Sequence, residues 1–183
     1  MELSDGERLI LIMLCEIHEH LKVKGEIDPK LVKSAIFHGN LWGLKSEYSG
    51  LFDVEETPED VVREVTDVLD MWSFLEEGYE QLSPADKKQV AAEAGPIGKH
   101  VQFTGFDGNN EIQHMGAARF MVKEMGKFSR FKGRELNSHM PSIEAYHRML
   151  GVFDPMRASL ESPMTAAQII QVLKAKIHPD MRK

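Results

Sequence analysis

Apolar residues recur with helical spacing over residues 57–82, the longest such pattern in the chain. They continue at every third or fourth position through three heptads, at Val61, Val65, Val68, Trp72, Leu75, Tyr79 and Leu82. Charged residues such as Glu64, Asp67 and Glu76 fall mostly outside this stripe, so the pattern predicts an amphipathic helix. Thr57 suits the N-cap and Pro58 the first helical position. At about 1.5 Å per residue the helix would be roughly 39 Å long, and other helices could pack around it.

The remaining pattern predicts further helices separated by turn residues. Capping and helix-breaking residues delimit them near 5–24, 31–38, 84–94, 111–125, 141–153 and 163–177, with broken helical spacing over 41–53. Residues 97–104 favour a short extended segment instead. We therefore expect an all-α fold, a multihelical bundle of about seven to eight helices around the long helix 57–82. A single domain over 1–183 should end in a short irregular tail after residue 178.

Two local features predict close helix packing. The first predicted helix is apolar on all sides from Leu9 to Cys15, which indicates burial on several sides, in the monomer core or at a dimer interface. The small residues Gly116, Ala117 and Ala118 would let a neighbouring helix approach closely.

Composition narrows the class of protein. With 183 residues, 42% hydrophobic and 28% charged, the chain can fill a core, and wholesale disorder is not expected. The single cysteine, Cys15, excludes an intramolecular disulfide and suits a reducing compartment. The acidic start does not resemble a secretory signal, and no apolar run approaches the length of a membrane span. We expect a soluble cytoplasmic protein that does not bind membranes.

Charge is distributed unevenly along the chain. Residues 1–96 carry 21 acidic and 9 basic side chains, a net charge of −12, whereas residues 97–183 carry 8 and 13, a net charge of +5. This asymmetry fits a basic face for an anionic partner, or two complementary halves of one assembly. It fits equally well with opposite charges that attract each other within the monomer.

Two Glu-x-x-His pairs, Glu111 with His114 and Glu144 with His147, allow a metal site as an alternative. In di-metal helical bundles this spacing directs both side chains toward a shared site, which single glutamates of two other helices complete. Glu16 and Glu64 could be those glutamates. However, 8 His and 19 Glu residues produce such pairs by chance, so we predict no metal and no cofactor. The turn at Asp107 lacks the later ligands of a calcium loop and is interpreted as a helix cap.

The stretch from 119 to 134 is the candidate binding site. It holds six basic residues against one acidic residue, Glu124, and these are Arg119, Lys123, Lys127, Arg130, Lys132 and Arg134. Phe120, Phe128 and Phe131 lie among them, and basic side chains with aromatic rings can bind phosphates and unpaired bases. Alternatively, the phenylalanines fix a loop to the core while the cations face water or an acidic protein partner. No nucleotide-binding loop, zinc-protease motif or nucleophile elbow is present.

Several stretches, in order along nearly the whole chain, resemble the YfbU family of bacterial proteins. They are residues 7–11, 67–75, 105–107 with Glu111, 118–122 and 146–150. The resemblance implies a mainly helical fold without accepted catalytic residues. The family domain sometimes occurs joined to a helix-turn-helix DNA-binding domain, which implies a ligand-binding or regulatory role.

Taken together, the residues and the resemblance predict a helical module that binds a ligand or a protein partner without catalysis. We expect it to act as a homo-oligomer, a dimer, in a regulatory or stress-related setting. Two alternatives remain: a metal-dependent enzyme that uses the two Glu-x-x-His pairs, and nucleic-acid binding through residues 119–134.

Overall fold

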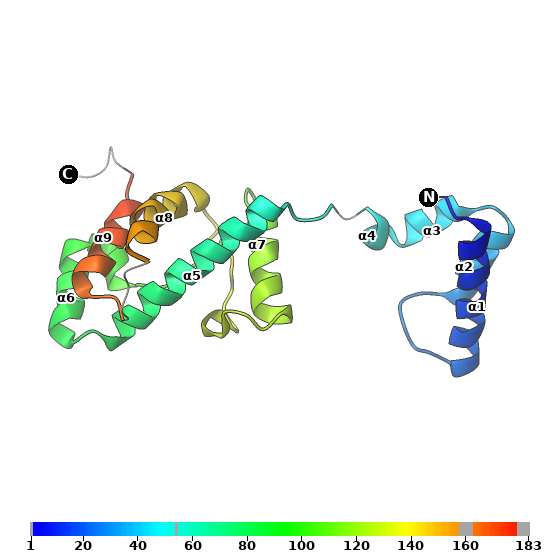
Figure 1. Cartoon of the computed structure of the whole chain (residues 1–183), viewed down its shortest axis with the longest axis horizontal. Coiled ribbons are helices and arrows are strands. Elements are labelled where there is room, and N and C mark those ends of the chain that lie inside the picture. The colour runs from blue at the N-terminus through cyan, green and yellow to red at the C-terminus, as the bar shows by residue number, and fades with distance from the viewer. Residues whose placement is uncertain (1, 54, 158–162, 179–183) are drawn as a thin grey trace. The chain divides into compact units, whose positions relative to one another are not determined.

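A computed structural model describes residues 2–53, 55–157 and 163–178. The chain forms two compact units, Met1–Glu56 and Thr57–Lys183 (Figure 1). The described residues contain nine α-helices, eight of them with seven residues or more, and a single isolated backbone bridge between Phe106 and Asn137. The predicted all-α fold class is thus confirmed. None of the described helices combines the length and the apolar character that crossing a lipid bilayer requires. The tail predicted after residue 178 lies outside the described residues.

The first unit consists of four helices, which are α1 (Asp5–Leu21), α2 (Pro29–Phe37), α3 (Leu41–Glu47) and α4 (Ser49–Phe52). Ser4 caps α1 as its sequence predicts, because its side chain accepts the N–H of Glu7 and the Glu7 carboxylate accepts the N–H of Ser4. The helix ends at Leu21, somewhat earlier than predicted, where Lys22 adopts a left-handed conformation with a φ of 52°.

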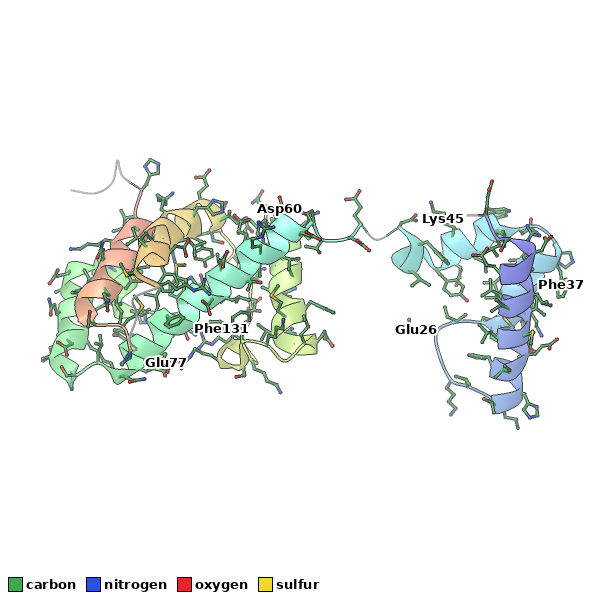
Figure 2. All side chains as sticks on the ribbon, in the orientation of Figure 1. Glu26, Phe37, Lys45, Asp60, Glu77 and Phe131 are labelled. Atoms are coloured by element: carbon green, nitrogen blue, oxygen red, sulfur yellow. The ribbon has the colours of Figure 1, made fainter. Side chains whose placement is uncertain are left out.

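The first unit has a small core and leaves much of α1 in water. Its buried residues are Cys15, Val32, Ala35, Ile36 and Leu44. Six large apolar side chains of α1 are each more than half exposed, namely Leu9, Ile10, Met13, Leu14, Ile17 and Leu21 (Figure 2). The segment Leu9–Cys15 was predicted to be buried on several sides, in the monomer core or at a dimer interface. The core of this unit does not bury it on several sides. The role of this segment as a dimer interface stays a prediction.

The second unit is built around α5 (Glu59–Gln81). The other helices are α6 (Pro84–Glu93), α7 (Ile112–Arg119), α8 (Ile143–Arg157) and α9 (Ala166–Lys176). A π-helical turn (Phe120–Glu124) extends α7, and 3-10 turns occupy Gly95–Lys99 and Ser129–Phe131. Figure 1 shows α7 beside the first half of α5. Helix α8 packs on the middle of α5, where Tyr146 lies beside Trp72 and Phe153 beside Phe74, and α9 also packs on α5.

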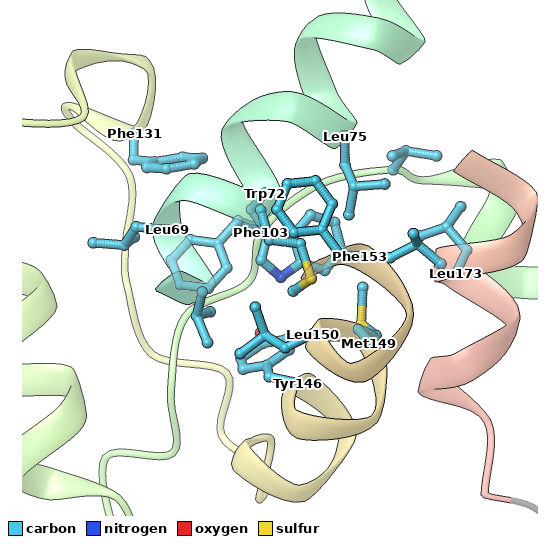
Figure 3. Packing of buried hydrophobic residues seen from close by; sticks show 14 of the residues in the cluster. Leu69, Trp72, Leu75, Phe103, Phe131, Tyr146, Met149, Leu150, Phe153 and Leu173 are labelled. Atoms are coloured by element: carbon cyan, nitrogen blue, oxygen red, sulfur yellow. The ribbon is translucent and has the colours of Figure 1, made fainter. Parts of the chain in front are cut away.

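The core of this unit surrounds Trp72, which has no exposed surface. Its ring centroid lies 6.1 Å from those of Phe103 and Tyr146. Figure 3 shows Leu69 and Leu75 of the same helix in this cluster, together with Phe131, Phe153 and Leu173 from other segments. The predicted apolar stripe is therefore the buried face of α5, although burial extends beyond the stripe to Leu69, Met71 and Gly78.

Three local predictions are wrong for reasons that the structure explains. The helix α5 begins at Glu59 without a side-chain cap, so Thr57 is not its N-cap. Glu76, expected outside the stripe, is only 3% exposed, and its carboxylate is accommodated there because it accepts the N–H of Phe103 at 2.7 Å. The helix predicted near 141–153 continues to Arg157 as α8, so the helix-breaking residue Pro155 lies inside it and does not end it. Pro155 lacks an N–H, so the hydrogen bond to the carbonyl of residue 151 is lost at this point of the helix.

Substitution by alanine at two helical glycines of the second unit should change its stability in opposite directions. A Cβ at Gly116 would meet no atom within 4 Å, whereas a Cβ at Gly78 would lie 2.9 Å from the Cβ of Met164. We expect Gly116→Ala to raise the free energy of unfolding by about 1 kcal/mol through helix propensity. Gly78→Ala should lower it by about 1–3 kcal/mol through overpacking.

Denaturant unfolding followed by the fluorescence of buried Trp72 measures both changes. A Trp42→Phe background removes the signal of Trp42, which is 73% exposed in the first unit. Equal effects of the two alanines would contradict the packing described for α5.

Candidate functional site

Acidic side chains of α5 pair with cations and histidines that follow it in the chain. Glu76 receives two hydrogen bonds from the guanidinium of Arg134, at 2.7 and 2.8 Å. Glu80 pairs with Arg130 at 2.7 Å. Arg157 of α8 contacts both Asp67 and Asp70. Ion pairs within the second unit therefore balance part of the uneven charge along the chain. This agrees with the interpretation that opposite charges attract each other within the monomer.

The two histidines of the Glu-x-x-His pairs meet on one carboxylate of α5. Nε2 of His114 lies 2.6 Å from Oε2 of Glu64, and Nε2 of His147 contacts the other oxygen, Oε1. Each imidazole nitrogen thus faces a carboxylate oxygen rather than a common point. Among the described residues, no group of three or more His, Cys, Asp or Glu side chains is arranged to hold a metal ion.

The glutamates of the two pairs do not join this cluster. Glu144 is exposed on α8, and Glu16 belongs to the first unit. Glu111 is 7% exposed and accepts hydrogen bonds from the N–H groups of Ser142 and Ile143, at 2.5 and 2.9 Å. The structure therefore does not bring together Glu111, His114, Glu144 and His147 as a ligand set. Instead, Glu111 caps the start of α8 from a position 31 residues earlier.

The turn before α7 is also different from the predicted cap. The carboxylate of Asp107 accepts hydrogen bonds within the turn, from the N–H of Asn109 and the amide of Asn110. Helix α7 itself begins at Ile112 without a side-chain cap. Asp107 therefore stabilises the turn rather than the helix, and these two hydrogen bonds lower the pKa of its carboxyl group.

The structure divides the six predicted basic binding residues into two groups. Arg130 and Arg134 are held by carboxylates of α5. The other four make no ion pair within the described residues, and these are Arg119, Lys123, Lys127 and Lys132. Phe131 is fully buried and Phe128 is partly buried against the same core. These two rings fix the loop to the core, as the alternative interpretation of the stretch predicted.

An apolar groove lies next to the unpaired cations in the sequence. It has a volume of about 420 Å³ and is lined by Thr57, Val62, Gly116, Ala117, Phe120, Met121 and Met125. Val62, Phe120 and Met125 are 38%, 59% and 49% exposed. We call this feature the α7 groove. The sequence pattern did not reveal it, because the π-helical turn shifts the spacing of residues 120–125 away from that of an α-helix.

The architecture defines a class, an all-α protein whose larger unit is built around one acidic helix. The match to known sequences is more specific: the model of the YfbU domain covers residues 1–175, and the chain belongs to the YfbU family. A relative is the UPF0304 protein MJECS11 of Methanocaldococcus jannaschii, 28% identical over an alignment of 182 residues that covers 94% of this chain and 99% of the relative. The resemblance seen in the sequence is confirmed. The match spans both compact units, and a single domain over 1–183 stays a prediction.

Removing the guanidinium of Arg134 should destabilise the second unit. The carboxylate of Glu76 is only 4% exposed, and it would then be a buried charge without its ion-pair partner. Breaking such a pair from one side costs about 3 kcal/mol. We expect Arg134→Met to lower the free energy of unfolding by about this amount, whereas Lys132→Met leaves it nearly unchanged. Chemical unfolding followed through Trp72 compares them, and equal stability of the two variants would contradict a structural role for Arg134.

Glu111 should make the second unit sensitive to acid. Burial raises the pKa of its carboxyl, but hydrogen bonds from Asp107, Ile143 and Ser142 outweigh burial and place the pKa below its ordinary value of 4.5. As the pH falls, the unfolded chain therefore binds this proton first. The stability that Glu111 contributes is present above pH 4.5 and is lost as the pH falls through the lower folded value.

Glu111→Gln tests this dependence. We expect the variant to be less stable than the parent by about 1–3 kcal/mol at pH 7, because the amide leaves hydrogen-bond donors of α8 poorly paired. The difference should shrink as the pH falls below 4.5. Urea unfolding at several pH values measures the difference in the free energy of unfolding between the parent and the variant. The contributions of all other carboxylates are the same in both proteins and cancel in this difference. A difference that does not change with pH would exclude this role of Glu111.

Proposed function

We propose that the chain is a non-catalytic protein-binding module whose α7 groove receives an acidic amphipathic helix of a partner protein. The proposal needs no cofactor. It includes a homo-oligomeric state, a dimer, and a regulatory or stress-related setting in the cytoplasm, which the single cysteine and the family resemblance favour. The observation that carries it is the open apolar groove beside Arg119, Lys123 and Lys127, which form no ion pair within the described residues.

The apolar lining supports a protein partner. Val62, Phe120 and Met125 stay in contact with water although the core beside them is complete. Covering such side chains is favourable because it removes apolar surface from water. The two methionines in the lining are flexible and polarisable, so they can adapt to the side chains of a partner.

The shape of the groove supports a helix as the bound element. Gly116 lies in the lining, and a Cβ there would meet open space. A partner backbone can therefore approach α7 closely at this point, as the small residues of this segment predict. Insertion of an amphipathic helix into an apolar groove is a recurrent mode of protein recognition.

The charges support an acidic partner. Arg119 and Lys123 lie within one helical turn of Phe120, and Lys127 follows Met125 by two residues. None of the three forms an ion pair in the described part of the chain. Opposite charges on a partner would steer its approach and fix its orientation.

Nucleic-acid binding through the same stretch has less support. Stacking on bases requires accessible aromatic rings, but Phe128 and Phe131 pack on the core. Arg130 and Arg134 already pair with carboxylates. Only Phe120 and four cations would remain for a nucleic acid, on a protein whose net charge is −7.

A synthetic helical peptide tests the proposal. The probe is a fluorescein-labelled peptide of about 18 residues, five helical turns, with leucines on one face and glutamates on the other. We expect it to bind the full chain, and we expect Phe120→Ser and the pair Lys123→Glu with Lys127→Glu each to weaken binding about tenfold. Fluorescence anisotropy measures affinity, and Lys88→Glu, an exposed lysine of α6, is the matched control.

Two comparison probes decide the outcome. A scrambled peptide of the same composition should bind poorly, because it presents no continuous apolar face. Equal binding of the scrambled peptide would reject the groove as a helix site. Tighter, salt-sensitive binding of a thymidine oligonucleotide, lost in the same lysine variants, would favour nucleic-acid binding instead.

A further inference from the structure

The helix α1 carries two apolar faces, of which the first unit covers one. Leu11, Ile12 and Cys15 point toward the small core and contact α2 and its neighbours. The opposite face is formed by the six residues that are each 51–65% exposed, namely Leu9, Ile10, Met13, Leu14, Ile17 and Leu21. At 3.6 residues per turn these six lie on one continuous side of the helix. We call this side the open face of α1.

The open face has the spacing of a helix that pairs with another helix. Ile10, Leu14, Ile17 and Leu21 are separated by four, three and four residues, as in a two-helix coiled coil. A groove of about 360 Å³ follows this side and is lined by Met13, Glu16, Ile17, His20 and Leu21. Exposed apolar patches of this extent on a small unit indicate an interaction surface.

The charges at the two ends of α1 identify the partner. Asp5 and Glu7 lie in the first turn beside the single cation Arg8, whereas Lys22 follows the last turn directly and Lys24 lies two residues further on. The one acidic residue of the last turn, Glu19, already pairs with Lys33 of α2. A second copy of α1 that runs in the opposite direction would place its basic end beside the acidic start of the first. Such a pair also aligns the helix dipoles favourably. A parallel pair would instead bring like charges together at both ends, so charge complementarity favours the antiparallel arrangement.

We propose that two copies of the chain associate through the open faces of their α1 helices, which run antiparallel about a twofold axis between Met13 and Leu14. This register places Ile10 opposite Ile17 of the partner subunit. It also brings Asp5 to the same level along the helix axis as Lys22 of the partner subunit. The arrangement is isologous, so each copy contributes the same surface and the assembly closes as a dimer. It specifies the dimer that the proposed function includes, but it uses residues of the first unit alone and does not depend on the α7 groove.

Light scattering of the full chain establishes the oligomeric state. We expect a dimer that dissociates on dilution, and Leu14→Glu should convert it to a monomer because the charge would lie at the axis. Leu14 is 54% exposed, so the fold of the monomer should be retained, which circular dichroism checks. Phe37→Glu, at a position 70% exposed on α2, is the matched control. A parent protein that stays monomeric, or a dimer that survives Leu14→Glu, overturns the proposal.

Cysteine cross-linking establishes the direction of the helices. In a Cys15→Ala background, Ile10→Cys and Ile17→Cys are prepared on chains of different mass, mixed and oxidised. Antiparallel pairing predicts that mixed disulfides exceed self-linked ones at least tenfold, because only facing positions come within disulfide range. Predominant self-linking of Ile10→Cys would show a parallel pair and overturn the proposal.

Charge exchange gives an independent measure of direction. Asp5→Lys alone should weaken dimerisation several-fold, and so should Lys22→Asp alone. The two changes together in one chain should restore the parent affinity if the helices are antiparallel, since each lysine again meets an aspartate. In a parallel pair each position faces its own copy, so neither single change would alter the balance of like charges, and unchanged affinity of both single variants would overturn the antiparallel arrangement. Lys30→Asp on α2 controls for the change in net charge.

Discussion

The burial of α5 on several sides is the constraint on which the second unit depends. A helix of 23 residues with Trp72 and Leu69 fully buried cannot be covered by one neighbour. The helices α7, α8 and α9 and the segment around Phe103 share this task. Each gains by removing apolar surface from water. The long predicted stripe therefore determines how many segments must gather around it, although it does not determine their order.

The same burial determines where the charges lie. The helix α5 carries eight acidic residues and one basic residue. Segments that cover its apolar face come close to these carboxylates at its edges. Glu64 accordingly contacts two histidines, and Glu76 is enclosed together with Arg134. Because a carboxylate that is removed from water requires a partner, the covering segments supply cations. The basic character of the second half of the chain is thus partly a consequence of the acidic helix at its centre.

Sequence periodicity predicted the helices well because helix formation depends on residues three and four positions apart. The Ser4 cap of α1 and the apolar stripe of α5 are local in this sense. The roles of Glu76 and Glu111 could not be predicted, since their partners are Arg134, 58 residues away, and Ser142, 31 residues away. The same limit applies to the Glu-x-x-His pairs. Their spacing aligns each pair on one helix, but only the packing of α7 and α8 on α5 brings the two histidines to Glu64.

The two units differ in the kind of side chain that they leave exposed, apolar in the first unit and cationic in the second. The first unit has five buried apolar residues in its core, fewer than the six large apolar side chains that stay exposed on α1 alone. A unit this small buries a modest fraction of its surface, and a partner that covers the open face would complete its core. In the second unit the apolar core encloses one face of α5, and Arg119, Lys123, Lys127 and Lys132 form no ion pair within the described residues. This difference is the reason for proposing a second copy of the chain as the partner of the first surface and an acidic helix as the partner of the second.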